Sequence, residues 1–253
     1  MPSEPRDGLC SLCMGHILLE GGSEFGGRME ECDRRAIQLA GGAGARIRIV
    51  PTAAVPDDNH QRAGENGVCW FRSLGAVDVS SLPLTDPRSA ADPRWVQELE
   101  GSQLIFILGG FPSYLEETLR GSPAWKAIRE APGTNAVLAG SSAGAMVLCQ
   151  WYWSPRDREI RPGLSLLQKT CLLPHHDSFG HSWVSALRGL PADTRLIGID
   201  EQTGVIDDGP KGRWRVYGKG FVTLYRNGHR VERFDRGQSF QMEPRATLPG
   251  DES

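Results

Sequence analysis

A single serine stands at the centre of a glycine-rich turn, and its hydroxyl is the first candidate for chemistry. The stretch from Val137 to Met146 reads VLAGSSAGAM, where an apolar run breaks at a G-x-S-x-G pattern centred on Ser142 and then resumes. This pattern is typical of a strand, a tight turn and a helix start, with glycine on both sides because larger side chains would collide. Ser142 is therefore a candidate nucleophile. The pattern is short, so a plain glycine-rich turn with a capping serine is the alternative.

A serine hydroxyl becomes a nucleophile only when a base takes its proton. The histidine doublet His175-His176 follows an apolar run at 169–173, and strand ends present side chains to a shared cleft. Either histidine could serve as the base. A metal site at this doublet is the weaker reading, because further well-spaced carboxylates are absent from its surroundings in sequence.

The base must itself be oriented by an acidic side chain. Asp200 and Glu201 follow another apolar run at 195–200, and as neighbours in an extended chain they point to opposite sides. We therefore expect only one of the two, Asp200 or Glu201, to face the histidine. Rival acids are Asp177, Asp157 and Glu159.

Backbone N–H groups can stabilise the oxyanion that forms when a hydroxyl attacks a carbonyl. One candidate donor is Ala143, at the start of the helix behind the serine. The strongest apolar run, 103–108, ends at Gly109-Gly110, so Gly110 is the candidate for the second donor. A plain tight turn at this glycine pair is the alternative.

The elements that must position these residues follow from apolar periodicity. Strands are expected at 16–20, 46–50, 103–108, 135–139, 169–173 and 195–200, and a further strand begins at residue 77. Helices are expected at 29–39, 60–71, 94–99, 114–119, 125–130 and 143–150, and a further helix ends at residue 187. Short hairpin strands are expected at 214–217, 221–225 and 231–234, joined by glycine turns. The aromatic and charged segment 151–159 is expected to be irregular, as a substrate-facing wall or as the edge of the core.

This order predicts an α/β protein with a mostly parallel sheet and C-terminal antiparallel hairpins. The three candidate side chains then meet because the carboxyl ends of parallel strands share one edge. We expect one domain over residues 16–243, preceded by a loose segment at 1–15 and followed by a loose tail at 244–253.

Composition and charge exclude some classes of partner and location. The chain has 253 residues and a net charge of -3, with Lys and Arg evenly scattered, so we expect neither a nucleic-acid partner nor a polybasic membrane surface. No apolar run approaches the length of a membrane span, and the N-terminus lacks the order of a secretory signal, which predicts a cytoplasmic protein.

The six cysteines lack the density of a disulfide framework. A Cys10-x-x-Cys13-x-x-His16 pattern has no fourth ligand at a suitable spacing, so free thiols are favoured over a zinc site. We therefore predict no metal and no cofactor.

Several of these segments, in order, resemble peptidase family S51, the cyanophycinases and dipeptidase E. They are a strand ending LGG at 108–110, GSSAGA at 140–145, PHxD at 174–177 and IGIDExT at 197–203, and the likeness spans roughly residues 16–225. The resemblance implies a class I glutamine-amidotransferase-like, flavodoxin-like three-layer sandwich. It also implies Ser142 as nucleophile, His175 as base and Glu201 as acid.

The chain departs from that family after the glycine pair, where Phe111-Pro112 stands in place of an acidic or amide residue and Gln. This departure predicts a more apolar pocket beside the oxyanion site. Arg156, Arg158 and Arg161 lie in a segment that could anchor an acidic substrate group or could be solvated surface.

The leading hypothesis is a serine-type peptidase that cleaves a small peptide or an isopeptide-like amide, such as a cyanophycin-like substrate, next to an acidic residue. Ser142, His175 and Glu201 would act in catalysis, with Gly110 and Ala143 holding the oxyanion, and a homodimer is one candidate assembly. Alternatives are a non-catalytic binding module that holds a small anion at the elbow and an esterase with the same nucleophile.

Overall fold

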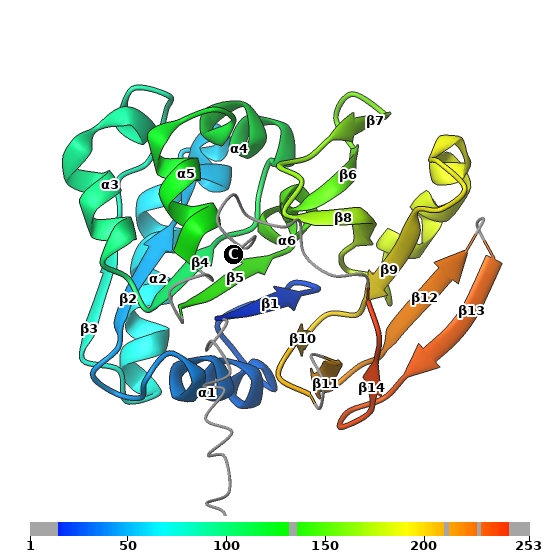
Figure 1. Ribbon diagram of the computed structural model, residues 1–253, viewed down its shortest axis with the longest axis horizontal. Helices are drawn as coiled ribbons and strands as arrows, with labels where there is room; N and C mark the ends of the chain where they lie inside the picture. Colours follow the sequence, from blue (N-terminus) through cyan, green and yellow to red (C-terminus); the bar gives the residue numbers. More distant parts are fainter. Residues whose placement is uncertain (1–14, 132–135, 210–212, 227–228, 243–253) are drawn as a thin grey trace, which may run out of the picture.

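The computed structural model describes residues 15–131, 136–209, 213–226 and 229–242. The expected loose ends at 1–15 and 244–253, with Cys10 and Cys13, fall almost wholly outside these ranges. Within them, the strands and helices form an α/β protein with two sheets (Figure 1).

The larger sheet has eight strands in the order β14-β11-β10-β1-β5-β4-β2-β3. Five of them form a parallel block that coincides closely with the apolar runs of the sequence: β1 (His16–Glu20), β5 (Val137–Ser141), β4 (Leu104–Ile107), β2 (Arg46–Val50) and β3 (Asp78–Ser81). Antiparallel strands extend this block beyond β1: β10 (Thr203–Ile206), β11 (Trp214–Gly218) and β14 (Ser239–Phe240).

Helices cover both faces of this sheet and complete the three expected layers. On one face α1 (Met29–Leu39) and α2 (His60–Ser73) pack over a core that includes Phe71 and Phe106. The other face carries the remaining α-helices: α3 (Pro93–Glu100), α4 (Pro112–Leu119), α5 (Pro123–Glu130) and α6 (Ala143–Leu148). Short 3-10 helices lie at η1 (Thr52–Asp57) and η2 (Ser89–Ala91).

A second sheet of six strands lies beside the first, in the order β13-β12-β9-β8-β6-β7. Its strands are β13 (His229–Phe234), β12 (Val222–Arg226), β9 (Arg195–Ile199), β8 (Leu167–Leu173), β6 (Cys149–Ser154) and β7 (Glu159–Pro162). A 3-10 helix, η4 (Gly180–Gly189), stands where the sequence suggested a helix up to 187. The C-terminal antiparallel strands are therefore divided between two sheets, whereas the sequence predicted one mostly parallel sheet with hairpins added to it.

Two sequence expectations are wrong at this point. The helix expected over 143–150 ends at Leu148, and the segment 151–159, expected to be irregular, contains most of β6 and the first residue of β7. Tyr152 is buried in the main core, whereas Trp151 and Trp153 pack on the cluster around Leu173. The aromatic side chains thus belong to the edge of the core, one of the two readings left open.

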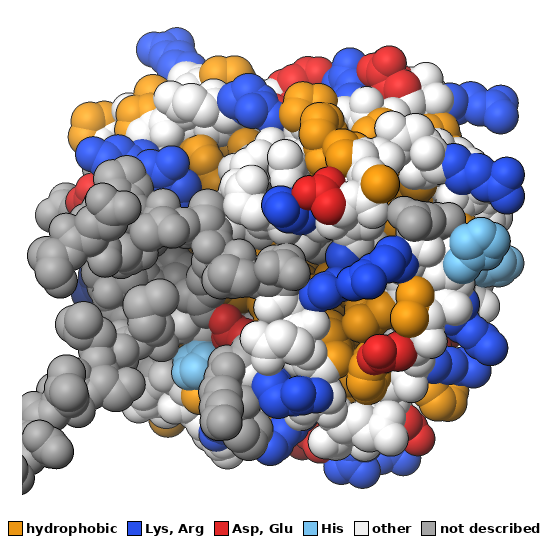
Figure 2. Space-filling view, turned by 45° about the vertical axis from the view of Figure 1, so that its right-hand side comes forward, with side chains coloured by type: hydrophobic (Ala, Val, Ile, Leu, Met, Phe, Trp, Pro, Cys, Tyr) orange, Lys and Arg blue, Asp and Glu red, His pale blue; other side chains and the backbone are white. Residues whose placement is uncertain are grey.

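The face in Figure 2 shows basic and acidic side chains interspersed, as the even scatter of charge along the sequence suggests. Among the described residues, no helix has the length and apolar character needed to cross a membrane.

Candidate active site

The turn after β5 has the geometry expected of a nucleophile elbow. Ser142 adopts φ 47° and ψ −113°, a strained conformation for a non-glycine residue, and its N–H donates to the carbonyl of Glu20 at 3.0 Å. A Cβ on Gly140 would lie 2.7 Å from the carbonyl carbon of Gly144, and one on Gly144 would lie 2.9 Å from that of Ile107. The two glycines of the G-x-S-x-G pattern are therefore required by the close approach of strand and helix.

The serine hydroxyl lies within hydrogen-bonding distance of one of the two histidines. Ser142 Oγ is 3.0 Å from His175 Nε2, and His175 Nδ1 is 2.8 Å from Glu201 Oε1. A carboxylate can only accept, so the Nδ1–H of a neutral imidazole donates to Glu201 and Nε2 is left to accept the serine proton. This chain of contacts can draw a proton from a hydroxyl as it attacks a carbonyl.

The second histidine has an acid of its own. His176 Nδ1 lies 3.2 Å from Asp200 Oδ1, and His176 Nε2 lies 2.8 Å from the hydroxyl of Tyr225. Asp200 is buried, and its other oxygen accepts from the backbone N–H of Phe221 at 2.9 Å. Neighbouring histidines thus pair with neighbouring acids, and only the His175 pair reaches Ser142.

The rival acids have other partners. Asp177 Oδ1 accepts a hydrogen bond from the backbone N–H of Glu201 at 2.9 Å. Asp177 therefore helps to position Glu201, the acid to which it was an alternative. Asp157 accepts from Ser154 Oγ at 2.7 Å and, like Glu159, pairs with Arg161.

Glu201 is well supported as an ionised carboxylate. Its Oε2 accepts from Ser23 Oγ at 3.0 Å, and Ser178 Oγ lies 3.5 Å from Oε1. The hydrogen bond from His175, followed by that from Ser23, lowers the pKa of Glu201 below its ordinary value. The carboxylate of Glu201 therefore stays ionised, and it can act as the negative partner of the His175 imidazole when that ring takes up a proton.

The three side chains do not come from one sheet, which corrects the expectation of a single parallel edge. Ser142 follows β5 of the larger sheet, whereas His175 and Glu201 follow β8 and β9 of the smaller one. The turn after β1 joins the two sheets: His175 N–H donates to Gly21 O at 2.7 Å, and Gln202 N–H donates to Gly22 O at 3.0 Å.

His175 is fixed by backbone as well as side-chain contacts. It adopts φ 47°, and its carbonyl accepts from the N–H groups of Ser178 and Phe179, in the turn before η4, and of Gly180, the first residue of η4. The ring of Phe179 stacks on the imidazole with centroids 4.8 Å apart, and Phe179 is itself 48% exposed. The imidazole therefore has one aromatic wall at the mouth of the site.

The glycine pair after β4 lies beside the nucleophile. A Cβ on Gly109 would be 3.1 Å from Ser142 Cβ. Gly110 has φ 137°, and a Cβ there would lie 2.6 Å from the carbonyl carbon of Ala53. Only glycine tolerates such a φ readily, so the close approach is built into the sequence. Gly109 thus lies next to Ser142, with Gly110 following it in the chain, and Ala143 follows the serine itself. The roles of Gly110 and Ala143 as backbone donors stay a prediction.

Sequence reasoning missed Glu24, whose Oε2 accepts from the hydroxyl of Ser141 at 2.8 Å, immediately before the nucleophile. It also missed Ser23 and Phe179. The sequence signal that could have indicated Ser23 and Glu24 was the Gly21-Gly22 turn at the end of β1. This turn places the two residues that follow it at the same edge as Ser142.

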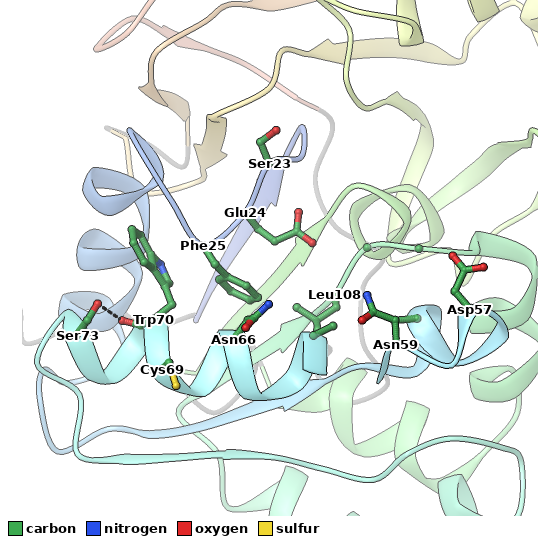
Figure 3. Close-up of a pocket in the computed structure, with 14 residues that line it drawn as sticks. Ser23, Glu24, Phe25, Asp57, Asn59, Asn66, Cys69, Trp70, Ser73 and Leu108 are labelled. Atoms are coloured by element: carbon green, nitrogen blue, oxygen red, sulfur yellow. Dashed lines mark hydrogen bonds between the residues drawn. The ribbon is translucent and has the colours of Figure 1, made fainter. Parts of the chain in front are cut away.

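A pocket of about 640 Å³ opens beside Gly109 and Gly110. Its lining combines apolar side chains with carboxylates and amides, and Phe111 and Pro112 are not among the lining residues (Figure 3). The expectation of a pocket more apolar than that of the cyanophycinases therefore stays a prediction.

Within the described ranges, no group of three His, Cys, Asp or Glu side chains is placed to hold a metal ion. His16, the last member of the cysteine-histidine pattern, lies 3.1 Å from Asp207 through its Nδ1. Cys10 and Cys13 lie outside the described residues.

Comparison with known proteins identifies the family of this chain. The family model described as peptidase family S51 matches residues 17–212. The chain belongs to peptidase family S51. It is 28% identical over 222 residues to the cyanophycinase of Synechococcus elongatus, covering 83% of this chain and 67% of that protein. The cyanophycinase of Geminocystis herdmanii is 29% identical over 222 residues, covering 82% of this chain and 79% of that protein.

Solved structures agree with this membership. The crystal structure of a peptidase from an acI-B1 actinobacterium superposes with a TM-score of 0.81 at 27% identity, over 90% of this chain and 97% of that one. A candidate peptidase E protein of Listeria monocytogenes EGD-e has a TM-score of 0.57 at 16% identity, over 84% of this chain and 98% of that one, which shows a shared fold. The S51 chain is thus a flavodoxin-like α/β protein of a peptidase family.

Proposed function

We propose that this S51 protein is a serine peptidase in which Ser142 attacks the scissile carbonyl, His175 carries the proton and Glu201 orients the imidazole. The observation that carries the proposal is the unbroken chain of contacts from Ser142 Oγ through His175 to Glu201, at 3.0 and 2.8 Å. Membership of a peptidase family supports hydrolysis of an amide over the two alternatives, a binding module and an esterase.

The catalytic cycle follows from these contacts. As Oγ bonds to the carbonyl carbon, its proton passes to Nε2, and the carbonyl oxygen gains the negative charge. The backbone N–H groups of Gly110 and Ala143 are the proposed donors to that oxygen. His175 then gives its proton to the leaving amine, and water releases the acyl group by the reverse sequence.

The substrate we propose is a small peptide or an isopeptide-like amide. The further expectation of an acidic residue beside the scissile bond stays a prediction. Arg161, one candidate anchor for such a residue, is already paired with Glu117, Asp157 and Glu159. Arg156 and Arg158 are exposed.

A substrate panel tests the activity. Dipeptides that vary at the first residue, β-linked aspartyl dipeptides and cyanophycin are incubated with the wild type and with Ser142→Ala, and free amines are quantified. We expect release from at least one amide by the wild type and none by the variant. Equal turnover by both proteins would refute the mechanism, and turnover of esters alone would favour an esterase.

A further inference from the structure

A large apolar side chain stands exposed beside the base of the proposed triad. Among the described residues, the large apolar side chains that are exposed are Val77, Phe179 and Val231. The ring of Phe179 stacks on the imidazole of His175, with centroids 4.8 Å apart and planes 24° apart. Phe179 thus brings apolar surface within reach of the reacting atoms.

The phenyl ring is held in place from several sides. The N–H of Phe179 donates to the carbonyl of His175 at 3.1 Å, and its own carbonyl accepts from the N–H and the hydroxyl of Ser182 at 3.0 and 2.6 Å. The ring centroids of Phe179 and Trp183 are 5.4 Å apart, and Trp183 is itself partly buried against the main core. The two rings therefore form an ordered aromatic platform, and a ligand that packs on an ordered surface has less entropy to overcome.

The imidazole decides which part of a substrate meets this platform. His175 Nε2 gives its proton to the leaving amine, so that amine and the residue attached to it lie next to the ring. A Cβ on Gly22 would lie 2.7 Å from the same Nε2, so the turn after β1 covers another part of the imidazole. Because the phenyl ring stacks on the imidazole, a side chain on the leaving residue can reach the exposed part of Phe179.

Charge argues against a basic side chain on the platform. When Nε2 takes the serine proton, the imidazole becomes positively charged, and a second cation on Phe179 would lie beside it. The carboxylate of Glu201 already accepts from His175 and from Ser23. The π-face of Phe179 also already faces the imidazolium, the kind of cation that it would otherwise attract. An uncharged apolar group therefore suits the platform better than a guanidinium or ammonium group.

We propose that Phe179, supported by Trp183, is a specificity-determining residue that binds an aromatic or branched aliphatic side chain on the residue whose amine leaves. This inference rests on the proposed serine peptidase mechanism and adds to it the class of leaving group. An amide whose leaving residue is phenylalanine or leucine satisfies it better than one whose leaving residue is glycine or arginine.

Protection of Ser142 from a small neutral fluorophosphonate tests the platform without any knowledge of the acyl residue. Phenylalaninamide, leucinamide, glycinamide and argininamide each present a leaving residue with its free amine, and each is titrated above about pH 8, where an α-amino group is largely neutral. The rate of Ser142 modification is followed by intact mass, and the readout is the amide concentration that halves it. Each protein is compared with its own unprotected rate, so an effect on the triad alone does not change this readout.

In the wild type we expect phenylalaninamide to halve the rate at a concentration at least about fivefold lower than glycinamide does, since an aromatic contact is gained. Phe179→Ala should bring this ratio close to one, whereas Phe179→Leu, which keeps apolar surface, should retain part of it. The matched control is Val77→Ala, which removes an exposed apolar side chain just before β3, at the opposite end of the parallel strands from Ser142. This variant should keep the wild-type ratio.

Other results overturn the platform and leave the mechanism standing. They are equal protection by phenylalaninamide and glycinamide, no protection by any of the four amides, or strongest protection by argininamide. A ratio that is unchanged in Phe179→Ala, with a slower unprotected rate, would show that the ring only positions His175. Failure of the fluorophosphonate to modify Ser142 in the unprotected wild type would instead refute the serine mechanism, and the platform with it.

Discussion

Gly22 lies directly against the imidazole of His175. A Cβ at this glycine would overlap the ring, at 2.7 Å from Nε2 and 2.8 Å from Nδ1. The turn after β1 therefore forms one wall of the site, and the absence of a side chain at position 22 is what lets the imidazole stand between Ser142 and Glu201.

Replacing that glycine should displace the base. We expect Gly22→Ala to slow fluorophosphonate labelling of Ser142 by about a hundredfold or more, because a shift of about 1 Å in a catalytic group has effects of that size. Its φ of 123° adds backbone strain. Gly26→Ala, in the same loop but with open space at its Cβ, is the matched control and should label at the wild-type rate. Similar rates for both variants would contradict the packing argument.

The two adjacent acids should have separable effects. Glu201→Gln removes the charge that faces His175, and we expect labelling to fall by about a hundredfold or more. Asp200→Asn weakens contacts to His176 and to the backbone of Phe221, so we expect a loss of about 1–3 kcal/mol in the free energy of unfolding. Labelling rates are compared on folded protein, and urea titrations give the stability. A larger loss of labelling in Asp200→Asn than in Glu201→Gln would reverse the assignment.

The buried acid Asp33 should make stability depend on pH. Burial raises the pKa of Asp33 to about 7, partly opposed by the hydrogen bond from Trp70. A carboxyl whose folded pKa is raised stabilises the fold fully below its unfolded pKa of about 4, and that contribution is lost as pH rises through about 7. We therefore expect Asp33→Asn to raise Tm at pH 8 by a few degrees relative to the wild type, and by less at pH 5. Thermal unfolding at both values checks this, and a larger gain at pH 5 would contradict the sign.

The elbow should not tolerate a side chain at its second glycine. A Cβ on Gly144 would lie 2.9 Å from the carbonyl carbon of Ile107 in the neighbouring strand. We expect Gly144→Ala to cost about 1–3 kcal/mol in the free energy of unfolding, as overpacking in a rigid core does. Gly44→Ala, with open space at its Cβ, provides the comparison in the same denaturant titration. Equal stability of the two variants would show that strand and helix can separate.

The centre of the parallel block was predictable because β4 is buried along its whole length and reads as an unbroken apolar run. The strands β1 and β2 begin and end where strands were expected, at 16–20 and 46–50. The elbow was predictable for a related reason, since the close approach of β5 and α6 leaves only glycine as an option on each side of Ser142.

In the second sheet the strands β8, β9, β12 and β13 were expected from the sequence, whereas β6 and β7 were not. The strand β6 buries Tyr152 in the main core on one side and packs Trp151 and Trp153 on a separate cluster on the other. Three aromatic residues in a row show no alternation of apolar and polar residues, and the charged residues that follow made the segment look irregular.

The residues of the candidate site also differ in how far the sequence could predict them. Ser142, His175 and Glu201 could be selected because each follows an apolar strand. The role of Glu24 could not, because it depends on how the turn after β1 folds over Ser141 and Gly109, which is a contact between distant parts of the chain.

The most direct test of the account is the site of covalent modification by a fluorophosphonate. Wild type, Ser142→Ala and Ser141→Ala are treated in parallel, and the adduct is located by peptide mapping. The account predicts one adduct, on Ser142, in the wild type and in Ser141→Ala, and none in Ser142→Ala. A wild type that stays unlabelled, or an adduct on another residue that persists in Ser142→Ala, would contradict it.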